Sequence, residues 1–126
     1  MDTDIQGIKI RLEIGLGEAL DRLSIFKIKY EKTGEKIFQE QLDKLSAQIT
    51  NWNDEVHDFY LTLLAVNNTL WELEDEIRTD IDVSRAAELA YDIIEINDKR
   101  SRVKLAVDLL NGEKVFDRKF YNEIKK

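Results

Sequence analysis

Twelve apolar residues recur in unbroken heptad phase through the middle of this chain of 126 residues. Successive members are separated by alternating steps of four and three, so all of them fall on one face of a helix. The twelve positions are Phe38, Leu42, Leu45, Ile49, Trp52, Val56, Phe59, Leu63, Val66, Leu70, Leu73 and Ile77. A continuous helix over residues 35–79 would measure roughly 65 Å. A compact domain of this length has a radius of gyration of only about 14 Å, so such a helix needs a partner along much of its length.

Two interpretations of this segment remain open. The unbroken phase favours one continuous helix, which is the structure we expect. Residues 51–54 favour a kink or a fold-back, because two Asn and one Asp stand beside Trp52 there and these residue types are typical of turns.

The other helices are predicted from periodicity and end signals. A helix over residues 17–32 should stop at Gly34, since Gly accepts the left-handed turn that follows many helices. Asp82 is a good N-cap type for a long helix over residues 83–111. A short helix over residues 114–124 should close the chain. The sequence therefore predicts an all-α protein, an elongated antiparallel helical bundle with a single domain.

The N-terminal residues 1–16 are predicted to form an extended arm. From Ile8 to Ile14, apolar and charged residues alternate with a period of two, which is the pattern of a strand. One strand cannot stand alone, so the arm must pair with another chain or lie on the helices.

Composition excludes several classes of protein. The chain has no Cys and a single His, which rules out disulfides, thiolate metal sites and sites that need two imidazoles. The net charge of -7 argues against DNA or RNA as a partner. No apolar stretch approaches the roughly 20 residues of a membrane span. The first residues also lack the basic character with which a signal peptide starts. We therefore expect a cytoplasmic protein without a membrane partner.

A row of polar residues runs beside the heptad positions. It consists of Asn67, Trp71, Glu74 and Arg78, each one position after a heptad residue, and a matching row on the last long helix consists of Asn97, Arg100, Lys104 and Asp108. If the two helices pair antiparallel through a turn near residues 80–82, the two rows meet in one region. Arg100 falls on an otherwise apolar face, where it needs a carboxylate or a bound anion, and Glu74 and Asp75 are the expected partners. A solvated ladder of surface salt bridges is the alternative.

Four carboxylates give an alternative metal site. Glu72 and Asp75 form one pair at i, i+3, and Glu95 and Asp98 form another. Oxygen ligands on helices suit Mg²⁺, and all-helical nucleotide pyrophosphatases use a comparable arrangement. Such pairs also arise by chance among 26 acidic residues. A Mg²⁺-dependent hydrolase is therefore an alternative, and a cofactor is expected only in that case.

Three segments, residues 17–29, 67–78 and 97–104, resemble the three motifs of a small helical family of bacteria and tailed phages that is known only as a domain of unknown function. We call them the first, second and third motifs. Their order agrees with the family, and the resemblance covers nearly the whole chain. It departs at Arg22, where Lys is expected, at Ser101, where Ala is expected, and in a shorter stretch between the first two motifs. The resemblance implies no activity.

The resemblance does indicate which polar residues matter. With Arg78 from the polar row, the candidate ligand-binding residues are Glu18, Asp21, Lys27, Lys29, Asn67, Trp71, Glu74, Asp75, Arg78, Asn97, Asp98, Arg100 and Lys104. This set suits a phosphorylated or nucleotide-type ligand. Its cations would bind oxyanions, its indole would stack on a planar ring, and its amides or carboxylates would bind hydroxyl groups. We expect binding without turnover, and sequestration of a nucleotide signal used in host defence is one such role for a phage protein.

A continuous helix would keep these motifs apart. Glu18 and Asp21 would then lie level with residues 46–49, roughly 27 Å along the axis from Asn67. One site then requires either a break near residues 51–54 or a second subunit. Because the heptad face exceeds what the chain's other helices can cover, we expect a dimer or larger homo-oligomer. A coiled-coil interaction module without any ligand is the third functional alternative.

Overall fold

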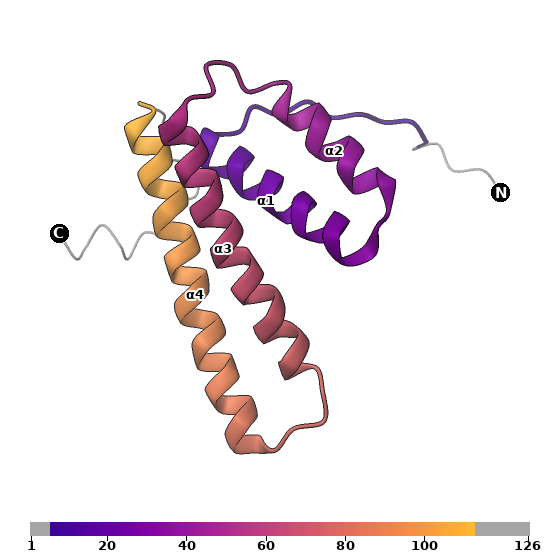
Figure 1. The fold of residues 1–126 in the computed structure, drawn as a ribbon, viewed down its shortest axis with the longest axis vertical. Coiled ribbons are helices and arrows are strands. Elements are labelled where there is room, and N and C mark those ends of the chain that lie inside the picture. Colours follow the sequence, from indigo (N-terminus) through magenta and orange to yellow (C-terminus); the bar gives the residue numbers. More distant parts are fainter. Residues whose placement is uncertain (1–5, 113–126) are drawn as a thin grey trace.

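The computed structural model describes residues 6–112, which fold as an all-α helical bundle without strands. Its four helices are α1 (Leu16–Thr33), α2 (Lys36–Ser46), α3 (Asp54–Ile77) and α4 (Val83–Leu110). Figure 1 shows α3 and α4 as an antiparallel hairpin, with α1 and α2 packed as a second antiparallel pair against its upper half. None of these helices combines the length and apolar character that a membrane crossing requires. The prediction of an all-α bundle is confirmed for the described residues.

The predicted continuous helix over residues 35–79 is wrong. Helix α2 ends at Ser46 and α3 begins at Asp54. Between them, Asn51 adopts a left-handed backbone with φ 58°, and the side chain of Asn53 caps α3 by accepting a hydrogen bond from the Val56 N–H at 2.8 Å. The fold-back at residues 51–54, which the sequence left open, is the structure that the chain adopts.

The heptad pattern continues across this break because the heptad residues of both helices pack against one core. Leu42 and Leu45 of α2 and Val56 and Phe59 of α3 all pack against the buried cluster that contains Leu63. The apolar face that suggested a partner chain is thus largely covered within the chain itself.

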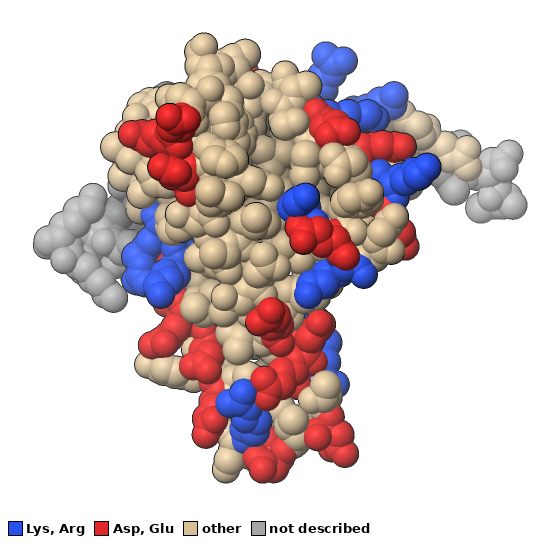
Figure 2. Space-filling model, viewed as in Figure 1, with Lys and Arg blue, Asp and Glu red and all other residues tan. Residues whose placement is uncertain are grey.

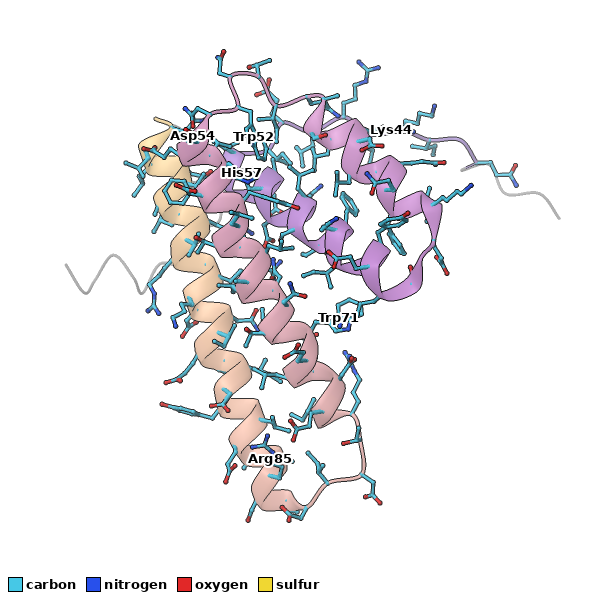
Figure 3. The ribbon with its side chains drawn as sticks, viewed as in Figure 1. Lys44, Trp52, Asp54, His57, Trp71 and Arg85 are labelled. Carbon is cyan, nitrogen blue, oxygen red and sulfur yellow. The ribbon has the colours of Figure 1, made fainter. Side chains whose placement is uncertain are left out.

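Trp52 also departs from its expected position on a packed seam. Its side chain lies in the connection between α2 and α3 and is 39% exposed. The indole packs edge-on against Tyr60, with ring centroids 5.9 Å apart, and against His57 at 6.1 Å. Figure 3 shows Trp52 and His57 together at this end of α3. These contacts hold the connection against the first turns of α3.

The remaining boundaries lie close to those expected. Helix α1 extends one residue beyond the expected 17–32 at each end and stops at Gly34, whose φ is 71° and whose N–H donates to the Tyr30 carbonyl. Helix α4 begins after Asp82, whose carboxylate accepts the Arg85 N–H, and ends one residue short of 111.

Residues 8–15 belong to no helix or strand. The short helix expected over residues 114–124 lies outside the described residues.

Helix α1 is the central element of the bundle, since it contacts each of the other three helices. It also supplies half of the small set of buried apolar side chains in the described part of the chain. These are Ala19, Leu20, Leu23, Ile28, Leu63, Leu70, Leu89 and Val107. Figure 2 shows acidic side chains over much of the lower end of the α3–α4 hairpin, which projects beyond α1.

A glycine allows the start of α1 to approach α4 closely. The Gly17 N–H donates to the Asp108 carboxylate at 2.7 Å. A Cβ added at Gly17 would lie 2.4 Å from the Lys104 carbonyl oxygen, which is a backbone atom and cannot move aside alone. The α1–α4 contact therefore requires glycine at this position.

This requirement gives a first prediction. Gly17→Ala should lower the free energy of unfolding by about 1–3 kcal/mol, although Ala favours a helix, because the two helices must separate. Chemical denaturation measures this change. Gly34→Asn is the matched control, since Gly34 has open space around it and Asn tolerates the left-handed turn. Equal stability of Gly17→Ala and the wild-type protein would contradict the close approach.

Candidate functional site

The carboxylate of Asp21 is completely buried on α1 and is held by side chains from two other helices. Arg100 on α4 donates from Nε to Oδ1 at 2.8 Å and from Nη2 to Oδ2 at 2.5 Å. Asn67 on α3 donates from Nδ2 to Oδ1 at 2.8 Å. A bidentate guanidinium with an added amide satisfies the hydrogen-bonding capacity of this buried carboxylate.

Ser24 completes this network. The Asn67 Nδ2 also donates to Ser24 Oγ at 2.7 Å, and Ser24 Oγ donates to the Asp21 carbonyl at 2.6 Å. We call Asp21, Ser24, Asn67 and Arg100 the Asp21 cluster. Across the described residues, every buried side-chain nitrogen or oxygen has a hydrogen-bond partner. The Asp21 cluster is therefore a satisfied polar core that joins α1, α3 and α4.

A second ion pair lies beside the cluster and ties α1 to α4. Lys104 Nζ donates to Glu18 Oε1 at 2.7 Å and lies 3.8 Å from Asp21 Oδ2. Arg22 Nε donates to the other Glu18 oxygen at 2.9 Å. Burial alone would raise the pKa of Glu18, but the hydrogen bonds from Lys104 and Arg22 outweigh it and hold that pKa below its usual value. The hydrogen bond to Asp21 raises the pKa of Arg100 against the opposing effect of burial.

A pocket of about 210 Å³ opens beside the Asp21 cluster, and we call it the Trp71 pocket. Its lining residues come from α1, α3 and α4, and they are Ile25, Ile28, Lys29, Asn67, Leu70, Trp71, Glu74 and Arg100. Trp71 is half-buried, as its position one residue off the apolar face suggests. In Figure 3 it projects from α3 on the side where α1 and α2 lie.

The structure gathers most of the candidate residues into two adjoining groups. Glu18, Asp21, Asn67, Arg100 and Lys104 form the polar contacts between helices. Lys29, Asn67, Trp71, Glu74 and Arg100 line the Trp71 pocket. Asn67 and Arg100 belong to both groups, so the cluster forms one wall of the pocket.

The other candidate residues lie elsewhere. Lys27 lies 3.9 Å from Glu31 on the surface of α1. Asp75 and Arg78 are exposed, and Asp98 lines a different pocket, which is formed by α4 residues alone. Asn97 is half-buried on α4 but lines neither of these two pockets.

The expected partner of Arg100 also needs correction. The sequence pointed to Glu74 or Asp75, whereas the guanidinium binds Asp21. The reason is the break after α2, which brings α1 alongside α3 and α4 and places its carboxylate between them. Glu74 acts on Arg100 only through longer-range attraction, as a minor contribution to the raised pKa.

The alternative metal site receives no geometric support. Among residues 6–112, no three His, Asp or Glu side chains lie close enough together to hold a metal ion. Glu95 and Asp98 do share a pocket of about 370 Å³, but Lys99 and Arg102 line it with them. Glu72 and Asp75 both lie on exposed parts of α3.

Two residues with important contacts were absent from the candidate set. Ser24 follows Asp21 by three residues and so lies on the same face of α1, which was the available signal. Asp108 was placed in the polar row of α4 but was not assigned to the site. It accepts the Gly17 N–H and fixes the start of α1.

The Asp21 cluster gives a second prediction. Arg100→Leu should lower the free energy of unfolding by on the order of 3 kcal/mol, because the buried Asp21 carboxylate loses its bidentate partner. Adding Asp21→Asn to the same chain should recover part of this loss by removing the unpaired charge. Arg102→Leu, an exposed change on the same helix, should stay within about 0.5 kcal/mol of the wild-type protein. Arg100→Leu with wild-type stability would contradict a structural role for the cluster.

The lowered pKa of Glu18 gives a third prediction. A carboxyl whose pKa is lower in the folded state stabilises the fold above its unfolded-state pKa, and this stabilisation is lost as the pH falls through the folded-state pKa. The free energy of unfolding should therefore fall more steeply between about pH 5 and pH 3 in the wild-type protein than in Glu18→Gln. Lys104→Gln should flatten the same part of the profile, because it removes the hydrogen bond from Lys104, which is the largest of the effects that lower the pKa of Glu18. Parallel profiles for all three proteins would show that the ion pair does not contribute.

Comparisons of this chain with models of protein families, with curated proteins and with solved structures find no match to it.

Proposed function

We propose that this protein binds a small anionic ligand with a planar group in the Trp71 pocket and releases it unchanged. One observation carries the proposal. Lys29, Trp71 and Arg100 come from the first, second and third motifs and from three different helices, yet they line one pocket. Packing of an apolar core does not require two cations and an indole in one place.

Each of these residues has a distinct part in binding. Arg100 uses Nε and Nη2 to hold Asp21, so its guanidinium is fixed and its Nη1 remains as a donor toward an oxyanion. Lys29 is a more mobile cation that lies 5.5 Å from the centre of the Phe38 ring. The half-buried Trp71 ring offers a face for stacking, and the Glu74 carboxylate accepts hydrogen bonds from hydroxyl or amino groups.

The dimensions of the pocket restrict the ligand. A volume of about 210 Å³ is below the range of about 300–1,000 Å³ that is typical of enclosed ligand sites. The pocket accommodates one planar ring and an adjacent phosphate, with the remainder of the ligand in solvent. A mononucleotide or cyclic mononucleotide therefore fits this proposal better than a dinucleotide does.

Binding is favoured over hydrolysis because the site holds donors without a cluster of acids. The only carboxylate lining the Trp71 pocket is that of Glu74, so the described residues provide no set of acids for a metal-dependent attack on phosphate. Binding without turnover also suits sequestration of a nucleotide signal, which is one role for a small phage protein.

A fluorescence titration tests this proposal. In a Trp52→Phe background, mononucleotides and cyclic mononucleotides are titrated while Trp71 emission is followed, and at least one should quench it saturably. Trp71→Leu should weaken binding at least about fivefold, measured by calorimetry, since stacking on one aromatic ring contributes about 1–3 kcal/mol. Lys29→Gln should also weaken binding, because it removes one of the two cations that line the pocket. Lys27→Gln is the matched control on the same helix, because Lys27 lies outside the pocket.

Two results would contradict the proposal. One is the absence of any saturable response, by fluorescence or calorimetry, across the panel. The other is a response that requires Mg²⁺ and is followed by phosphate release, which would identify a hydrolase.

A further inference from the structure

Within the N-terminal arm, residues 8–14 present an apolar face to solvent, and we use the word arm for these residues from here on. Ile8, Ile10 and Leu12 are 65%, 86% and 78% exposed. The alternate residues are charged, so the arm has the two distinct faces of a strand that is buried on one side. Within residues 6–112 no strand lies beside it, and an extended segment of this kind is a template for pairing with another strand.

An open groove lies at the base of the arm. Its volume is about 610 Å³, and the arm itself forms one wall through Leu12, Glu13 and Ile14. Leu45 and Ile49 contribute apolar surface from α2 and the segment after it. The groove thus adjoins the strand-like segment and is wide enough to accept apolar side chains.

We propose that two copies of this chain pair their arms as antiparallel strands centred on Leu12, with each arm filling the groove of the other copy. The charges on the arm select this register. Centred on Leu12, Arg11 lies opposite Glu13 of the partner subunit, and this attraction occurs twice.

The neighbouring registers place like charges opposite one another. Centring on Arg11 pairs Lys9 with Glu13 of the partner subunit but sets Arg11 directly against its own copy. Centring on Ile10 sets Lys9 against Arg11 of the partner subunit. Centring on Glu13 opposes two carboxylates. Directly opposed like charges destabilise a strand pair, so the register centred on Leu12 is the favoured one.

The same register brings the exposed apolar residues to the groove. The partner's Ile10 lies opposite Ile14, and the partner's Ile8 reaches the level of Leu16. Ile14 and Leu16 both line the groove. Pairing therefore covers the exposed side chains of both arms and fills two grooves at once. This association is independent of the Trp71 pocket, which the arm does not line.

Charge reversal tests the pairing. Light scattering and sedimentation at micromolar concentrations should give the wild-type full chain twice its mass of 14.8 kDa. Arg11→Glu alone and Glu13→Arg alone should each weaken association at least about tenfold, and the double variant should restore it. Lys9→Glu is the matched control, because Lys9 lies opposite Gly15 of the partner subunit in this register.

Disulfide trapping tests the register, because the natural chain has no Cys. Under mild oxidation Leu12→Cys should link to its own copy. Ile10→Cys should link poorly to itself but readily to Ile14→Cys in a mixture of the two variants. A wild-type monomer, a dimer that is unaffected by both single charge reversals, or self-linking of Ile10→Cys as readily as Leu12→Cys would overturn the proposal.

Discussion

The carboxylate of Asp21 imposes the main physical constraint on this fold. A charge that is fully removed from water requires compensating partners, and here they come from α3 and α4. Because Arg100 must reach both carboxylate oxygens while Asn67 reaches one of them, α1 has one position against the hairpin. The small number of buried apolar side chains would define that position less sharply.

The same constraint connects the fold to the proposed site. Arg100 can present a fixed guanidinium edge to the Trp71 pocket because Asp21 orients the other edge. Asn67 is oriented in a similar way, since its amide donates to Asp21 and to Ser24. The residues that stabilise the helix contacts therefore also order one wall of the pocket, which would reduce the cost of ordering side chains in the proposed binding.

Much of the secondary structure could be predicted from the sequence, because its signals are local. Gly34 and Asp82 mark helix ends through their own backbone or side-chain chemistry. The break between α2 and α3 could not be decided in this way. A heptad pattern shows which face of a helix is apolar. It looks the same for one continuous helix and for two helices joined by a connection that keeps the heptad spacing. Asn51 and Asn53 were the local signals of the reversal, but their contribution depends on how α2 packs against α1.

The site was predicted only in part, for a related reason. Motif positions indicated the residues around Asn67, Trp71 and Arg100, and the structure brings these together. The partner of Arg100 depended on the path of α1, which is a tertiary feature. Sequence alone also could not separate Lys29, which lines the pocket, from Lys27, which lies on the surface of the same helix.

The end of the α3–α4 hairpin that projects beyond α1 should unfold separately from the rest of the bundle. Near this end, the contacts between the two helices include the buried Leu89 and the exposed pair of Arg85 and Glu76, and exposed pairs contribute little. We therefore expect this end to open without disturbing the Asp21 cluster, as a separate local unfolding unit. Amide hydrogens near the turn at residues 78–82 will then exchange faster than those around Leu63 and Val107, and the boundary between slow and fast exchange will fall close to the Trp71 pocket.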